Sequence, residues 1–166
     1  PASLVHLALT DSTGVDRLFE DNSFATLESL TLVRSDISRD GLRKLAAESG
    51  ALTRLEVDQC SSGSVLAFAR NLPKAITSGH PAALRYFVSH SHLSDEAVRT
   101  LIMFCPQLET LSLVEVPSLV AIKQASRCLP NLQHLRFCAS DGASAWNEVE
   151  LAKLAESCPS LCELNV

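Results

Sequence analysis

Apolar residues recur along this chain in one short pattern, Leu-x-x-Leu-x-Leu. Its copies begin at positions 4, 27, 52, 84, 108, 132 and 161, so the steps between them are 23, 25, 32, 24, 24 and 29 residues. Within a copy, apolar and polar residues alternate, as in Leu30-Thr31-Leu32, which is typical of a strand with one buried face. The fourth copy is weaker, because Ser89 takes its last apolar position. The pattern predicts about seven strands.

Between the strands the apolar spacing changes to that of a helix. Three segments carry apolar residues at i, i+3 and i+4: Leu42, Leu45 and Ala46; Val98, Leu101 and Ile102; and Leu151, Leu154 and Ala155. Residues that cap helix starts precede them: Ser38, Ser94 and Asn147. Residues that end helices follow: Gly50, Pro106, Pro130 and Pro159. We expect an α/β fold in which strands and helices alternate and all strands run parallel.

Two connections are longer than the others. In the 32-residue step, residues 64–70 are predicted as a helix that Pro73 interrupts. The 29-residue step holds the small-residue stretch 139–145 ahead of Trp146, which we expect to pack a loop against a neighbouring helix. In repeat proteins such insertions fall in loops on one face of the array.

The repeats resemble the cysteine-containing leucine-rich repeats of F-box substrate receptors and of ribonuclease-inhibitor-like proteins. Residues 30–45 (LTLVRSDISRDGLRKL), 93–108 and 151–161 carry the resemblance. It implies a leucine-rich repeat solenoid, with a curved parallel β-sheet on the concave side and α-helices on the convex side. We expect residues 1–166 to form a single such domain. Because Leu4 and Val166 both lie within copies and solenoids need capping units, we expect a fragment of a longer array.

Composition narrows the possible partners. Fourteen Lys and Arg against 19 Asp and Glu give a net charge of −5, which argues against a nucleic-acid partner. No apolar run reaches the roughly 18 residues of a membrane span, so no membrane partner is expected. Six cysteines in 166 residues are too few for a disulfide scaffold. They favour structural thiols in an intracellular, reducing compartment, the cytoplasm foremost.

Groups that could carry chemistry are few. Cys105, Cys128 and Cys158 each precede a strand and are expected to pack as small apolar side chains. His90-Ser-His92 lacks the spacing of a hydrolase triad or a metal site, and single glycines form no phosphate cradle. We therefore expect no catalytic residues, no metal site and no cofactor, and a protein that is not an enzyme.

The open face of the sheet remains as the candidate site. Alternation directs the residues between the leucines outward, at 6, 8 and 10; 29, 31 and 33; 54, 56 and 58; 86, 88 and 90; 110, 112 and 114; and 134, 136 and 138. Tyr and Arg are enriched among residues that dominate binding energy, and both charge signs occur on this face. The predicted partner-binding residues are Arg54, Glu56, Asp58, Tyr86, His90, His134 and Arg136.

The leading hypothesis is a non-enzymatic protein–protein interaction module or scaffold that binds a protein partner through the concave sheet, within a multi-subunit complex. The resemblance implies an alternative, the substrate-receptor arm of an F-box-type ubiquitin ligase, although no F-box segment is recognisable ahead of Leu4. A further alternative is a GTPase-activating regulator built on a leucine-rich array. The sequence leaves these three open.

Overall fold

The computed structural model of the chain describes residues 4–21, 24–35, 37–77, 82–116, 122, 128–139 and 148–165. The described strands are β1 (His6–Thr10), β2 (Ser29–Val33), β3 (Arg54–Val57), β4 (Tyr86–Ser89), β5 (Thr110–Val116), β6 (His134–Ala139) and β7 (Glu163–Asn165). The described helices are α1 (Val15–Asp21), α2 (Arg39–Glu48), α3 (Ser62–Thr77), α4 (Asp95–Phe104) and α6 (Glu148–Ser157).

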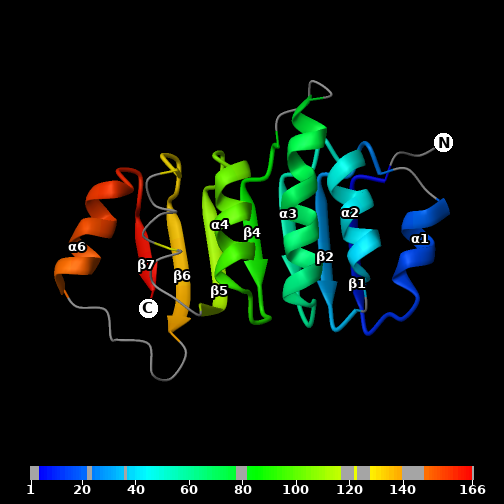
Figure 1. Ribbon diagram of the computed structural model, residues 1–166, viewed down its shortest axis with the longest axis horizontal. Helices are drawn as coiled ribbons and strands as arrows, with labels where there is room; N and C mark the ends of the chain where they lie inside the picture. The colour runs from blue at the N-terminus through cyan, green and yellow to red at the C-terminus, as the bar shows by residue number, and fades with distance from the viewer. Residues whose placement is uncertain are drawn as a thin grey trace.

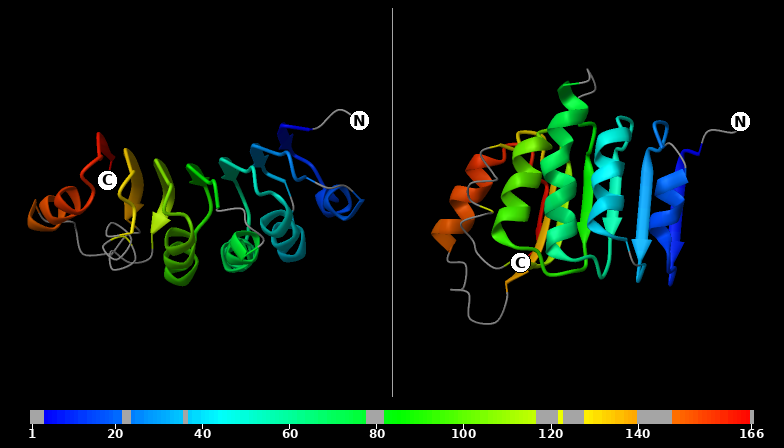
Figure 2. Two further views of the ribbon diagram at one scale, coloured as in Figure 1. Left: turned by 90° about the horizontal axis from the view of Figure 1, so that it is seen from above. Right: turned by 45° about the vertical axis from the view of Figure 1, so that its right-hand side comes forward.

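The strands form one parallel sheet in the order β1 to β7, which is their order along the chain. Figure 1 shows the elements in this succession, from α1 and β1 at one end to α6 and β7 at the other. Seen from above in Figure 2, the sheet follows the inner side of an arc and the described helices follow its outer side. The predicted α/β class with an all-parallel sheet of about seven strands is confirmed, and the arrangement is solenoid-like.

The core lies between the sheet and the helices. The inward residues pair in register across the strands: Leu7, Leu30, Leu55, Phe87, Leu111, Leu135 and Leu164. The five central members of this row are buried, whereas Leu7 and Leu164 on the edge strands are only partly buried. Neighbouring units therefore bury each other's apolar residues, as expected for stacked repeats.

Ser89 is the polar exception in the second inward row, between Val57 on β3 and Leu113 on β5. It is fully buried. Its hydroxyl donates to the carbonyl oxygen of Ser91 at 3.1 Å and accepts from the Ser91 N–H at 3.3 Å. A buried hydroxyl is tolerated when its hydrogen bonds are satisfied, so the irregular fourth copy still forms a regular strand.

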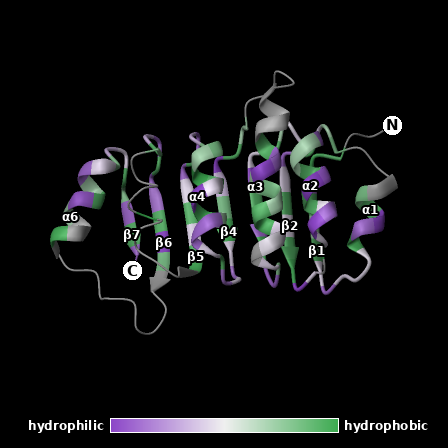
Figure 3. Cartoon of the chain, in the orientation of Figure 1, coloured by the Kyte–Doolittle hydropathy of each residue, from purple (hydrophilic) through white to green (hydrophobic). Residues whose placement is uncertain are grey.

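Helices α2 and α4 begin directly after the predicted capping residues Ser38 and Ser94. Ser38 Oγ accepts hydrogen bonds from the N–H groups of Asp40 and Gly41 at the start of α2, and Ser94 Oγ accepts from the Ala97 N–H at the start of α4. The predicted apolar faces of both helices are buried: Leu42, Leu45 and Ala46 on α2, and Val98, Leu101 and Ile102 on α4. Figure 3 shows the corresponding alternation of hydrophobic and hydrophilic residues along these helices.

Two expectations about helices are wrong. Helix α3 runs from Ser62 to Thr77 without a break at Pro73. It packs against both α2 and α4 and buries Val65, Phe68 and Ala69, and this packing outweighs the one backbone hydrogen bond that proline removes. On α6, Ala155 is exposed although its spacing placed it inward; α6 does not pack closely against another described helix. Residues 140–147, including Trp146 and the expected cap Asn147, lie outside the described residues.

The turns after the first three strands share one unusual conformation. Asp11, Arg34 and Gln59 have φ values of 50°, 46° and 60°, and each follows the first inward leucine of its strand by four residues. The left-handed conformation costs a residue with a side chain roughly 1–2 kcal/mol. Arg34 Nε and Nη2 donate to the two Asp11 carboxylate oxygens at 2.6 and 2.7 Å, which links the first two of these turns. The first three units are therefore built to the same plan.

The described helices include none that is long and apolar enough to cross a membrane.

Candidate partner-binding face

The side of the sheet away from the helices carries the predicted site residues. The first outward row comprises His6, Ser29, Arg54, Tyr86, Thr110, His134 and Glu163, and the second comprises Ala8, Thr31, Glu56, Val88, Ser112, Arg136 and Asn165. Asp58 and His90 lie just beyond β3 and β4, where their N–H groups donate to Leu32 O at 2.8 Å and to Val57 O at 3.0 Å. We call this surface the open face.

Four of the predicted residues form one connected group, the central cluster. The guanidinium carbon of Arg54 lies 3.7 Å from the ring centroid of Tyr86. Nη2 of the same arginine lies 3.1 Å from Glu56 Oε2, and the other Glu56 oxygen lies 3.5 Å from His90 Nε2. The Glu56 side chain is 21% exposed and is thus the most sheltered charge of the group.

The central cluster restricts the motion of large side chains on a surface that is otherwise open. A cation–π contact at an exposed site contributes about 0.5–1 kcal/mol, and a surface ion pair contributes about 0–1 kcal/mol. These contributions matter less for the stability of the fold than for the conformation of Arg54 and Tyr86. Because both side chains are already positioned, less side-chain entropy is lost when a partner covers them.

An open depression of about 480 Å³ lies beside the central cluster, over β4, β5 and β6; we call it the face hollow. The residues that line it are Glu56, Tyr86, Val88, His90, Thr110, Leu111, Ser112, His134, Leu135, Arg136 and Glu163. Val88 is 5% exposed although it belongs to an outward row, since its neighbours cover it. The face hollow therefore combines an apolar residue with a polar border.

Glu163 is a member of this site that the sequence prediction missed. Its Oε2 lies 3.2 Å from Nδ1 of His134. The sequence does contain a signal for Glu163. The alternation that places His134 outward in the sixth copy also places Glu163 outward in the seventh. The prediction extended the outward rows only as far as β6.

Asp58 stands apart from the other six predicted residues and does not line the face hollow. The hydrogen bonds and the charge of Asp11 raise the pKa of Arg34, and the charge of Asp58 adds to this effect. Conversely, the hydrogen bonds from Arg34 hold the pKa of Asp11 below its usual value. The prediction thus joined two groups, the residues around the face hollow and a charged strip at the carboxyl ends of the first three strands.

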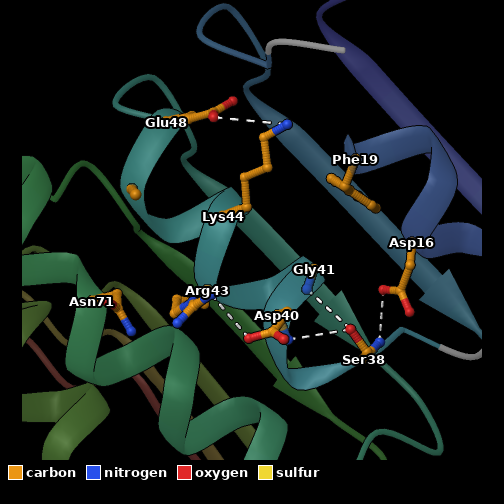
Figure 4. A pocket seen from close by; sticks show the side chains of 10 residues that line it. Asp16, Phe19, Ser38, Asp40, Gly41, Arg43, Lys44, Glu48 and Asn71 are labelled. Atoms are coloured by element: carbon orange, nitrogen blue, oxygen red, sulfur yellow. Dashed lines mark hydrogen bonds and ion pairs between the residues drawn. The ribbon is translucent and has the colours of Figure 1, made fainter. Parts of the chain in front are cut away.

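A second depression, of about 440 Å³, lies on the helix side between α1, α2 and α3 (Figure 4). Its polar groups are paired within the chain. The pairs are Asp16 Oδ1 with the Ser38 N–H at 2.9 Å, Asp40 with Arg43 at 3.1 Å, and Lys44 with Glu48 at 3.9 Å. Since each charge already has a partner, this depression offers a ligand little that the protein does not use itself.

The described cysteines differ in burial. Burial raises the pKa of the Cys105 thiol to about 12 and also raises that of Cys158. Cys128, expected to pack inside, is exposed, because Leu129 takes the buried position that Cys105 and Cys158 occupy in their units. Among the described residues, no three His, Cys, Asp or Glu side chains are arranged to hold a metal ion.

A comparison of the sequence with protein-family models gives no match, and neither does a search of curated proteins.

Proposed function

We propose that this chain is a leucine-rich repeat module that binds a partner protein through its open face and carries no catalytic activity of its own. The observation that carries the proposal is the central cluster, in which Arg54 lies over Tyr86 and is paired with Glu56, at the edge of the face hollow. Arg and Tyr are the residue types that most often dominate binding energy at protein interfaces.

The repeat assignment within this proposal is supported by regularity at three levels. The leucine pattern recurs seven times. The inward residues of all seven copies share one register across the sheet. The first three strands end in the same left-handed turn without a glycine. Sheets of stacked repeats present extended surfaces that suit protein ligands rather than small molecules.

The size of the open face sets how a partner would use it. Strands lie about 4.8 Å apart and rise about 3.3 Å per residue, so seven strands of about five residues cover roughly 450 Å². A standard interface buries about 800 Å² on each partner. A partner of ordinary affinity would therefore also contact the turns at the strand ends, where Asp58 and His90 lie.

The proposal is tested with two matched triple variants of the full chain. The first carries Arg54→Ala, Tyr86→Ala and Arg136→Ala on the open face. The second carries Arg43→Ala, Met103→Ala and Lys153→Ala at exposed positions of α2, α4 and α6. Each is immobilised beside the wild-type protein, crosslinked in native lysate and examined by mass spectrometry.

Proteins that bind through the open face should be recovered with the wild-type chain and with the helix-side variant, but not with the open-face variant. Circular dichroism melting curves should show that both variants remain folded. Equal recovery of the same proteins with the open-face variant would contradict the proposal. Recovery that only the helix-side variant loses would move the binding surface to the helices.

A further inference from the structure

Arg136 on the open face has no ion-pair partner among the described residues. On this face Arg54 is paired with Glu56, and His134 is paired with Glu163. At the strand ends, Arg34 is paired with Asp11. Within the described part of the chain, no carboxylate lies within ion-pair distance of the exposed guanidinium of Arg136.

The neighbours of Arg136 leave its donors available. In its row it stands between Ser112 on β5 and Asn165 on β7, both of which are uncharged. A guanidinium offers five N–H donors in a planar fork that matches the two oxygens of a carboxylate. The hydroxyls of Thr110 and Ser112 line the same hollow and can donate to the same anion.

We propose that the face hollow receives a single carboxylate, an Asp or Glu side chain of the partner protein, and that Arg136 binds it in a bidentate pair. This inference rests on the proposed function and specifies the chemistry of the partner. Charge complementarity determines the occupant, because Arg136 is the only Arg or Lys among the residues that line the hollow, and its guanidinium has no carboxylate partner within the described part of the chain.

A carboxylate fits this position better than a phosphate group. Two carboxylates, Glu56 and Glu163, also line the hollow. Their repulsion acts on an incoming anion in proportion to its charge, and a phosphate ester carries about −1.5 to −2 at neutral pH. The attraction to Arg136 grows with the charge of the anion in the same way, but two carboxylates oppose one guanidinium, so the balance disfavours the group with the higher charge. The same two carboxylates disfavour a nucleic-acid backbone.

The test uses a library of random twelve-residue peptides displayed on phage and selected on the immobilised full chain. Parallel selections use Arg136→Gln, Tyr86→Ala and a matched control, Arg43→Gln on α2. We expect the wild-type and control proteins to enrich peptides that share one Asp or Glu position. Replacing that residue by its amide in a synthetic peptide should weaken binding to the wild-type protein at least tenfold, but binding to Arg136→Gln less than twofold.

Each other result has a defined meaning. Enriched peptides that need Tyr86 but share no acidic position would overturn the carboxylate assignment and leave the open face as the binding surface. Peptides insensitive to both Tyr86→Ala and Arg136→Gln, or a failure to enrich any peptide, would overturn the proposed function as well. Tighter binding of a peptide with phosphoserine at the acidic position would assign the hollow to phosphate instead.

Discussion

Gly41 in the first turn of α2 provides the sharpest test of how neighbouring units fit together. A Cβ atom at this position would lie 2.5 Å from Asp16 Oδ1 and 3.0 Å from Ile37 Cγ1. Asp16 belongs to α1, and the same oxygen accepts the hydrogen bond from the Ser38 N–H at 2.9 Å. The substitution Gly41→Ala would therefore push the Asp16 carboxylate away from the N–H of Ser38, the residue that caps α2 (Figure 4).

The expected cost follows from three effects. Losing a hydrogen bond to a charged acceptor costs about 1.5 kcal/mol, the lower end of the usual range because the site is partly buried. Displacing the Ile37 side chain from its preferred rotamer costs about 0.5–1.5 kcal/mol. Alanine favours the helix over glycine by about 1 kcal/mol. Gly41→Ala should thus lower the free energy of unfolding by about 1–2 kcal/mol.

A double-mutant cycle with Asp16→Ala isolates the contact between the two units. Once Asp16 is removed, Gly41→Ala has no hydrogen bond to break, and its effect should fall to within about 0.5 kcal/mol of zero. The coupling, about 1.5 kcal/mol, is measured by urea denaturation followed by circular dichroism. It corresponds to about 3–6 °C in melting temperature for a chain of this size. Equal effects of Gly41→Ala in both backgrounds would refute the proposed contact.

Three further outcomes are expected. Leu55→Ala, at a position 1% exposed in the central inward row, should lower the free energy of unfolding by about 2–5 kcal/mol in urea titrations; a loss below 1 kcal/mol would mean that the row is not packed as described. Arg34 lowers the pKa of Asp11 in the folded state, so the Asp11 carboxylate stabilises the fold at pH values above its ordinary pKa of 3.8. This stabilisation is lost as the pH falls through the lowered pKa. The difference in urea midpoint between wild type and Asp11→Asn should accordingly shrink below pH 3.8, and a difference independent of pH would exclude the ion pair as its source. Iodoacetamide at pH 8 should alkylate exposed Cys162 while Cys105, buried with a pKa of about 12, reacts only after unfolding, as mass spectrometry of digested samples would show.

The outward and inward rows could be predicted because a strand has a period of two. Once Leu30 and Leu32 are assigned inward, Thr31 must face outward, and a regular parallel register extends the assignment from strand to strand. Helices α2 and α4 could also be predicted from the sequence, because Ser38 and Ser94 cap their starts through local hydrogen bonds. These features depend on residues that are close in sequence or repeated at a fixed spacing.

The remaining features depend on contacts between units. The residues next to Pro73 in the sequence do not indicate that α3 packs against α2 on one side and α4 on the other. Glu56 accepts a hydrogen bond from Arg54 on its own strand and faces His90, which lies just beyond β4. The central cluster therefore depends both on side-chain rotamers and on the pairing of β3 with β4. Likewise, Gly41 is an ordinary helix position until α1 brings Asp16 against it.

The order of the strands has a consequence for the way the molecule opens. Within the described residues, each strand pairs only with its neighbours along the chain, and no described element joins β1 to β7. Detaching an edge strand breaks one ladder and leaves the rest of the sheet intact, and the partly exposed Leu7 and Leu164 offer the least resistance to it. In this stretch of chain taken by itself, local stability should therefore be graded, lowest at the outer strands β1 and β7 and highest around β3 to β5. The central cluster lies on β3 and β4, in the part of the molecule that persists longest while the ends fray.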